Sequence, residues 1–424
     1  MNTGAGTSPH FVRAVAALGA RCPVVVRSPI VNTMGVKVLD QGVVIDERLY
    51  KRLMSHRLTL PLAECVGSEP MVTADDVREA VRVLIEQEPI YALMAGQGKQ
   101  RDILLTEIAL IPLPAPVAFQ LTVMRETRPA AWSHALRAAV AAAWLAGALQ
   151  GSRFDMRHLA LAGLVHDLGL LHLDPVLDSP KETLSAGQLR QLLSHALLSV
   201  AQLERHHEFP GELLRAVLEH HEALDGSGYP RQLAGAAISP WGRILALAEL
   251  VVGLFNGERR LPAVRLMVAL RLNRHRYDAA GTNEVMQLLR GLPTEPMPAP
   301  ERDPKQRLGE LELLLQRWPA DAPAQTPPAR RRVVADVRAQ AEQVMRSLAT
   351  AGATRAQLVH LGPDMLDDEL KVELDLLAGE LAWQVRAVAR QARDRWRRQA
   401  DEALPDWMAQ WLEAADVACE SSPG

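Results

Sequence analysis

Ten of the thirteen histidines in this 424-residue chain lie between His134 and His275. Within that region, histidine and carboxylate side chains recur, singly or in pairs, about 25 to 32 residues apart. They are His134, His166 with Asp167, His195, His220 with His221, and Glu249. Each interval accommodates one helix and a loop, so successive helices of a bundle could each project a ligand inward, as helical metal sites do. Histidine and carboxylate ligands without cysteine favour Fe, Mn, Zn, Co or Ni over a thiolate-bound structural zinc.

Several other histidines are predicted to be ordinary core or surface residues, since a single histidine on an apolar helix more often packs than binds a metal. They are His158, His172 and His275. His206-His207-Glu208 repeats the string found at residue 220, but a Pro-Gly pair follows it, which predicts an exposed turn between helices. His220-His221-Glu222 instead ends an apolar helical run and enters a shaped, glycine-containing loop over residues 225–230.

The sequence at these positions resembles a known family. His166-Asp167 matches the HD signature of metal-dependent phosphohydrolases, and residues 220–230 match the HHExxDGxGYP signature of the HD-GYP subfamily. A lone His-Asp pair would carry little information, whereas a match of eleven residues is specific. The resemblance covers about residues 125–285 and includes residues 276–279, which look like the short motif that closes such domains. Residues 23–66 resemble, much more weakly, the small β-containing module found ahead of some HD-GYP domains.

The resemblance implies a bacterial phosphodiesterase that hydrolyses cyclic di-GMP in signal transduction. It implies two divalent transition-metal ions, iron or manganese favoured, which together activate a hydroxide. One ion would bind His134, His166, Asp167 and Glu249. The second would bind His195, His220 and His221, with Asp167, the implied catalytic residue, bridging the two ions. The residues implied to face the substrate, orient ligands or shape the loop are Glu222, Asp225, Gly228, Tyr229 and Pro230.

Several positions depart from the family pattern. Leu170 stands where the HDxGK motif has a lysine, so a positive charge is missing beside the substrate phosphate. Glu249 replaces the final metal aspartate on a longer arm, and Val252 replaces a further aspartate three residues on. Ala130 replaces the glutamate of members with a third metal, which predicts at most two ions. Ser199 replaces a glycine and is predicted to affect only packing.

These departures leave two classes of function open. In the first, the chain is a cyclic dinucleotide phosphodiesterase with altered efficiency or substrate, or a phosphohydrolase that acts on another nucleotide. In the second, it is a degenerate, non-catalytic module that binds metal or nucleotide, or docks a signalling partner protein. Metal content separates both from a purely structural relic, which has no reason to keep the ligands.

Composition limits the remaining possibilities. Hydrophobic residues make up 48% of the chain and charged residues 23%, as in a soluble globular protein with a sizeable core. The net charge of −3 provides no global basic field for nucleic acid or a membrane surface. The richest apolar run, Ala138 to Leu149, is too short to span a bilayer. Cys22, Cys65 and Cys419 are scattered, which predicts reduced thiols in a cytoplasmic protein.

The chain is predicted to be mainly α: a helical HD-type bundle with a small N-terminal α+β module and a C-terminal helical region. β-branched runs between Pro23 and Ile45 predict a small antiparallel sheet, and Thr73 and Pro129 predict helix starts. The predicted domains are residues 1–124, the α+β module; 125–290, the HD-GYP-like domain; 291–328, a Pro-rich linker with a short helix; and 329–424, the C-terminal helices. A fragment that ends near residue 290 is therefore expected to fold.

The C-terminal region carries two further patterns. Arginines between Arg386 and Arg398 form a basic stretch, which acidic neighbours such as Glu373 predict to be a solvated helix face and not a nucleic-acid surface. Leucines at helical spacing predict either a core face or a homodimer face. They are Leu366, Leu370, Leu374 and Leu377.

Overall fold

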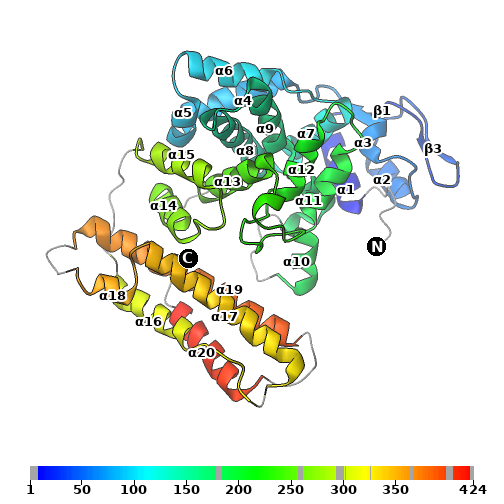
Figure 1. Cartoon of the computed structure of the whole chain (residues 1–424). Coiled ribbons are helices and arrows are strands. Elements are labelled where there is room, and N and C mark those ends of the chain that lie inside the picture. Colours follow the sequence, from blue (N-terminus) through cyan, green and yellow to red (C-terminus); the bar gives the residue numbers. More distant parts are fainter. Residues whose placement is uncertain are drawn as a thin grey trace. The chain divides into compact units, whose positions relative to one another are not determined.

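The computed structural model describes residues 8–177, 184–255, 261–292, 300, 302–324, 326–361, 366–397 and 404–420. Helices make up most of this part of the chain and the strands are short, which confirms the predicted mainly α fold (Figure 1). The chain folds as two compact units: Met1–Asn256 with Arg276–Leu292, and Gly257–His275 with Pro293–Gly424. Among the helices described, none combines the length with the apolar character that a bilayer crossing requires.

The N-terminal part of the first unit contains the small sheet that the β-branched runs predict. Its strands are β1 (Val24–Val26), β2 (Ile30–Val31), β3 (Lys37–Leu39) and β4 (Val66–Ser68). β1 pairs antiparallel with β4, and β2 pairs antiparallel with β3. Residues 43–45, the third predicted run, form no strand and contribute a bridge between Val25 and Val44. The sheet is therefore two short ladders and not one meander.

Helices precede, separate and follow these strands along the sequence and lead into the rest of the unit. They are α1 (Pro9–Gly19), α2 (Glu47–Met54), α3 (Leu62–Cys65), α4 (Ala74–Gln87), α5 (Pro89–Ala95), α6 (Lys99–Ala109) and α7 (Ala115–Thr127). The predicted start of α4 is confirmed: Thr73 and Asp76 form a reciprocal capping box that satisfies exposed amide groups of the first turn.

The remainder of the first unit is the helical bundle that carries the histidines. It contains α8 (Pro129–Ala148), α9 (Arg153–Val165), α10 (Ala186–Leu192), α11 (His195–Leu203), α12 (Gly211–Glu219), α13 (Pro240–Phe255) and α15 (Ala279–Leu289), with 3₁₀ turns η1 (Leu168–His172), η2 (Pro175–Leu177) and η3 (Gly235–Ala237). α8 begins at the predicted proline, which is compatible with the first helical position because its missing N–H has no partner there. A Cβ at Gly163 would lie only 2.5 Å from the carbonyl oxygen of Ala138, so glycine permits the close packing of α9 on α8.

The described part of the second unit is helical throughout. It contains α14 (Pro262–Leu272), α16 (Pro304–Gln316), α17 (Pro328–Thr350), α18 (Arg355–Leu358), α19 (Asp368–Arg397) and α20 (Asp406–Glu420). Its core includes the large side chains of Trp318, Trp396 and Trp411. Val268 and Leu272 of α14 are buried in the same core. α14 therefore packs with the C-terminal helices although α15, which follows it in the sequence, belongs to the first unit.

This arrangement bears on the predicted domain boundaries. Residues 257–275 fall inside the predicted HD-GYP-like domain, yet they pack with the second unit. The apolar pattern of α14 is that of any core helix, so it does not indicate which core the helix joins. The boundaries at residues 124, 290 and 328 stay predictions, and prolines 293, 296 and 298 of the predicted linker lie outside the described residues.

Arginines of the predicted basic stretch form ion pairs within the second unit. Arg393 Nη2 lies 3.1 Å from Asp416 Oδ2, and Arg395 Nη1 lies 2.8 Å from Asp336 Oδ2. These pairs join α19 to α20 and to α17, which is the intrabundle pairing that the acidic neighbours predict. Residue 398 of the stretch lies outside the described residues.

We expect a chain that ends after Leu292 to form larger assemblies than the full chain, because removing the C-terminal helices exposes Val268 and Leu272 of α14. Burying an apolar side chain of this size lowers the free energy by roughly 1.5–3 kcal/mol, and this gain favours association of the truncated chains. Size-exclusion chromatography with light scattering measures the effect. The same truncation with Val268→Ser and Leu272→Ser is the matched control and should recover the assembly state of the full chain. A truncated chain that behaves like the full chain without these changes would mean that α14 needs no C-terminal partner.

Candidate metal centre

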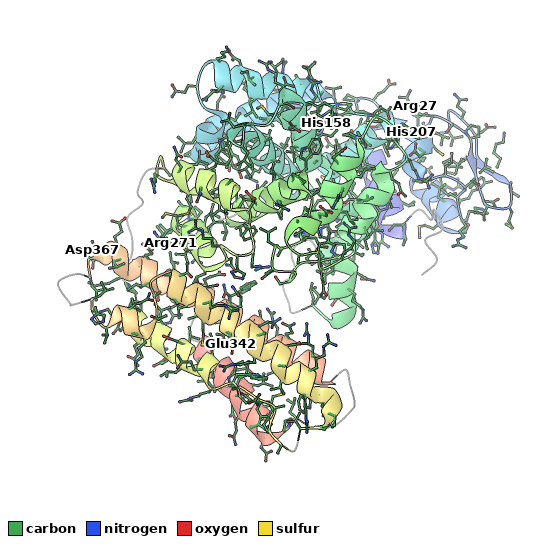
Figure 2. The ribbon with its side chains drawn as sticks, viewed as in Figure 1. Arg27, His158, His207, Arg271, Glu342 and Asp367 are labelled. Atoms are coloured by element: carbon green, nitrogen blue, oxygen red, sulfur yellow. The ribbon has the colours of Figure 1, made fainter. Side chains whose placement is uncertain are left out.

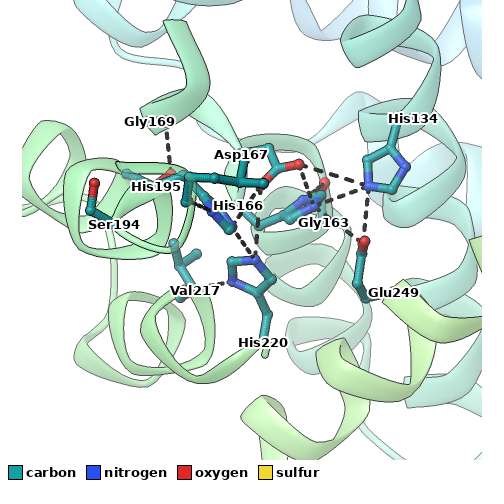
Figure 3. A network of polar contacts seen from close by, with 12 residues as sticks. His134, Gly163, His166, Asp167, Gly169, Ser194, His195, Val217, His220 and Glu249 are labelled. Carbon is teal, nitrogen blue, oxygen red and sulfur yellow. Dashed lines mark hydrogen bonds and ion pairs between the residues drawn. The ribbon is translucent and has the colours of Figure 1, made fainter. Parts of the chain in front are cut away.

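The first unit brings together all the side chains that the histidine spacing singles out. Figure 3 labels all of them except His221. They are, with their positions, His134 (α8), His166 and Asp167 (directly after α9), His195 (first residue of α11), His220 and His221 (directly after α12) and Glu249 (α13). Most of these residues stand at a helix end, where the rigid helix fixes the backbone while the side chain remains free to turn inward. The site therefore depends on how α8, α9, α11, α12 and α13 meet.

One group of ligand atoms gathers around His134. Its Nε2 lies 2.9 Å from Glu249 Oε2 and 3.3 Å from His166 Nε2. His166 Nε2 is 3.4 Å from Glu249 Oε2 and 3.4 Å from Asp167 Oδ2, and His134 Nε2 is 3.9 Å from that same Asp167 oxygen. Ligand atoms about 2.1 Å from a shared ion lie about 3.0–3.4 Å apart at octahedral or tetrahedral angles. The spacing of this group fits a transition-metal ion.

A second group gathers around His220. Its Nε2 lies 3.1 Å from His195 Nε2, and a ring nitrogen of His221 lies within 4.8 Å of both. Asp167 Oδ1 faces this group, 3.3 Å from His195 Nε2 and 3.8 Å from His220 Nε2. Although buried, that oxygen accepts no hydrogen bond from the described residues. Asp167 thus directs one oxygen to each group, which is the geometry of a bridging carboxylate.

The backbone fixes the protonation of three histidine rings. The Nδ1 atoms of His166, His195 and His220 lie 2.6–2.7 Å from carbonyl oxygens three residues earlier. Carbonyl groups at helix ends lack intrahelical donors, and because a carbonyl can only accept, each Nδ1 must carry the hydrogen. In the neutral form of such a ring, Nε2 carries the lone pair and faces the site. Two lone pairs 3.1 Å apart, as in His195 and His220, repel unless a cation lies between them.

Charge and burial act in opposite directions at the first group. Burial opposes the charged forms of His166 and Asp167, but their mutual attraction raises the pKa of His166 and lowers the pKa of Asp167 well below its usual range. Burial likewise opposes the charge of Glu249, but His134 beside it lowers the pKa of that carboxyl well below its usual value. Both carboxylates are therefore ionised at neutral pH and available to a cation.

The pKa values of His220 and His221, in the second group, are shifted the other way. Burial, reinforced by neighbouring His221, lowers the pKa of His220 well below its usual value, and burial lowers the pKa of His221 to about 4. Both rings are consequently neutral at pH 7. Neutral imidazole is the form that ligates transition metals.

An open cleft of about 500 Å³ lies beside these ligands in the first unit. His220, His221 and Glu249 form part of its wall, and loop residues Ser227 to Tyr229 together with Arg276 and Tyr277 form another part. Arg276 Nε is 3.9 Å from Asp225 Oδ2. This nitrogen is buried and donates no hydrogen bond to the described residues. The cleft therefore joins the candidate metal centre to a guanidinium group.

Hydrogen bonds, close packing and a ring contact hold the loop over residues 222–233. Glu222 accepts hydrogen bonds from the backbone amides of Arg231, at 2.7 Å, and Leu233, at 2.9 Å. A Cβ at Gly228 would lie 2.4 Å from Cα of Glu222, so only glycine fits there. The Tyr229 ring stacks on His221 with a centroid distance of 4.6 Å and precedes Pro230 at the end of the signature. Glu222 thus shapes the loop, and Tyr229 supports a ligand and lines the cleft.

Several histidines lie apart from the cluster, as the sequence predicts; Figure 2 labels His158 and His207 among them. His158 Nδ1 lies 2.8 Å from the Phe154 carbonyl oxygen, and His275 Nδ1 lies 3.3 Å from Ser347 Oγ in the second unit. His206 and His207 occupy the predicted turn between α11 and α12. The His206 ring, however, is only 9% exposed and lies 3.7 Å from Glu64 Oε1, so the turn is exposed while this ring is not.

The structure shows the surroundings of three of the positions that depart from the family pattern. The prediction that Ser199 affects only packing is wrong: its buried Oγ accepts a hydrogen bond of 2.8 Å from the amide of Gly169, and so it ties α11 to the turn that carries Asp167. Val252 is fully buried in α13. Leu170 is half-buried in η1 and is not among the residues that line the cleft.

The region that carries this site is similar to known proteins. Residues 118–280 match the family model described as "HD domain". The 3'3'-cGAMP-specific phosphodiesterase 1 of Vibrio cholerae is 35% identical over 128 residues, which cover 28% of this chain and 27% of that protein. A cyclic di-GMP phosphodiesterase of Pseudomonas aeruginosa is 30% identical over 210 residues, 46% of this chain and 50% of that protein. A solved HDG"Y"P protein from Bdellovibrio bacteriovorus aligns with a TM-score of 0.35 and 15% identity, over 64% of this chain and 94% of that one, which carries no argument.

Residues 118–280 thus match the HD domain family, and residues 220–230 within them carry the HD-GYP signature. The chain spans between about a quarter and a half of the length of the curated relatives it matches.

We expect Asp167→Ala to remove metal from both groups, because one bridging carboxylate serves both ions. Elemental analysis of protein purified without chelator should fall from about two ions per chain to near zero. Asp174→Ala, which removes an exposed carboxylate from the same region, is the matched control and should leave the metal content unchanged. Full metal occupancy in the Asp167 variant would contradict the bridging geometry.

The two His-His-Glu strings provide a second test. Replacing His206 and His207 together with alanine should leave the metal content unchanged, since neither lies in the cluster. Replacing His220 and His221 together should lower it by about one ion per chain or more, because the second group loses two of its ligands. An equal loss from both double variants would overturn the ligand assignment.

Proposed function

We propose that the chain is a metal-dependent phosphodiesterase that hydrolyses cyclic di-GMP with two divalent transition-metal ions. The observation that carries the proposal is Asp167, whose two oxygens face two separate groups of histidines beside an open cleft. The relatives support it, because they are named as phosphodiesterases of cyclic di-GMP or of 3'3'-cGAMP.

In this proposal each group of ligands holds one ion. The proposed ligands are His134, His166, Asp167 and Glu249 for one ion, and His195, His220, His221 and Asp167 for the other. When bound, two such ions supply a nucleophile at neutral pH and offset the negative charge of the phosphodiester. Iron or manganese is proposed because the donors are imidazole and carboxylate. The hydrogen bonds from histidine Nδ1 atoms to the backbone hold the rings in the orientation that ligation requires.

The cleft is suited to an anionic nucleotide. Arg276 places a guanidinium group in its wall, and guanidinium groups donate to phosphate oxygens with favourable geometry. Tyr229 and Tyr277 line the same cleft and offer flat rings on which a purine base can stack. A volume of about 500 Å³ lies within the usual range of small-molecule sites.

A second candidate function is a non-catalytic module that binds metal or nucleotide, or docks a signalling partner. The absence of a lysine at Leu170 favours it, because the ligand set is retained while a cation expected beside the phosphate is missing.

Two further predictions from the sequence, the cytoplasmic location and a homodimer, stay predictions.

Metal analysis run beside a hydrolysis assay tests the proposal. Protein purified without chelator is analysed for metals and incubated with cyclic di-GMP or with 3'3'-cGAMP, and the products are separated by chromatography. We expect about two ions per chain, and hydrolysis of cyclic di-GMP that chelation abolishes and added Mn²⁺ or Fe²⁺ restores. Metal-loaded protein that binds but does not hydrolyse either nucleotide would establish the second candidate. Preferential hydrolysis of 3'3'-cGAMP would reassign the substrate.

We expect Leu170→Lys to raise kcat/KM for cyclic di-GMP while the metal content stays constant. Leu170 does not line the cleft itself, but the HD-GYP pattern has a lysine here, and its longer side chain would add a cation for the phosphate without adding a metal ligand. A single preorganised donor of this kind is worth roughly 10²–10³ in rate, which sets the upper limit of the gain. Leu170→Met, which lengthens the side chain without charge, is the control. No gain in a folded, metal-loaded variant would place the defect at Glu249 or favour the non-catalytic candidate.

A further inference from the structure

Glu219 immediately precedes the two histidines of the second group, and its carboxylate is completely buried. Oε1 accepts hydrogen bonds of 2.8 Å from Arg215 Nε and 2.8 Å from Arg231 Nη2. Oε2 accepts hydrogen bonds of 2.7 Å from the amide and 2.6 Å from the hydroxyl of Ser239. This carboxylate is too fully occupied to serve as a metal ligand.

The partners of Glu219 belong to three different segments. Arg215 lies one turn earlier on α12, Arg231 directly follows the GYP sequence of the loop, and Ser239 directly precedes α13. The first turn of α13 lies against the carboxylate, because a Cβ at Gly242 would be 2.6 Å from Glu219 Oε2. One buried group thus connects the end of α12, the cleft loop and the start of α13.

These segments carry ligands of both groups. The end of α12 presents His220 and His221, while α13 presents Glu249 of the other group. We propose that Glu219 is a positioning residue that fixes the two halves of the metal centre relative to each other. This inference rests on the proposed function, since it assumes that both groups bind ions.

Glutamine at this position cannot reproduce the contacts. All four partners are donors, and an amide replaces one acceptor oxygen with a donor nitrogen. In either orientation, the amide nitrogen would face Arg215 and Arg231 or would face Ser239. The charge that strengthens the remaining hydrogen bonds would also be lost. Groups that orient metal ligands in this way affect metal affinity by about 10–100-fold when they are replaced.

Titration with Co²⁺ tests the inference without reference to activity. Protein stripped of metal by chelation is titrated, and binding is followed through the visible absorption of Co²⁺, which reports the coordination geometry. We expect Glu219→Gln to weaken both binding events by about 10–100-fold and to change the absorption bands of both. Glu212→Gln, an exposed carboxylate on the same helix, is the matched control and should match the unmodified chain.

Ser239→Ala provides a milder variant in case Glu219→Gln does not fold. It removes the hydroxyl donor towards α13 but keeps the backbone amide, so a weaker effect in the same direction is expected. Unchanged affinities and spectra in folded Glu219→Gln, or in Ser239→Ala when the first variant does not fold, would overturn the inference. An unmodified chain that binds no Co²⁺ would instead contradict the proposed function itself.

Discussion

A carboxylate remains ionised in a protein interior only where positive charge compensates it. Asp167 imposes this requirement on the first unit, because its oxygens point in two directions and both are surrounded by histidine nitrogens. Protons on the histidine Nε2 atoms could supply this charge, and a proton between His195 and His220 would also separate their opposed lone pairs. In the proposed function two metal cations take the place of these protons, so the bundle is organised around a charge that none of its helices could hold alone.

The ends of the helices are as important as their apolar faces. His166 and His220 stand where α9 and α12 terminate, and there they satisfy carbonyl groups that have no intrahelical donor. The same hydrogen bonds set the ring orientation and leave Nε2 facing the site. At these positions the same hydrogen bond therefore satisfies the end of the helix and orients the candidate ligand.

The spacing of the histidines predicted which residues meet, because side chains that successive helices direct to one site recur at regular intervals in the sequence. It did not predict the roles of Ser199 and Glu219, because each depends on donors brought from other segments by the tertiary fold. The pairing of β1 with β4 was also missed, because short strands about forty residues apart carry no sign of their partner. Periodicity thus identified elements and ligands, whereas the contacts between elements required the structure.

The placement of α14 affects the order in which the chain can be completed during synthesis. Val264 of α14 packs with Val372 of α19, which leaves the ribosome roughly 100 residues later. At translation rates of about 5–20 residues per second, α14 waits roughly 5–20 s for this partner. During that interval α15 emerges and can join the first unit, while the apolar face of α14 stays uncovered. Transiently exposed apolar surface of this kind is prone to aggregation, and it is the kind of surface that chaperones cover.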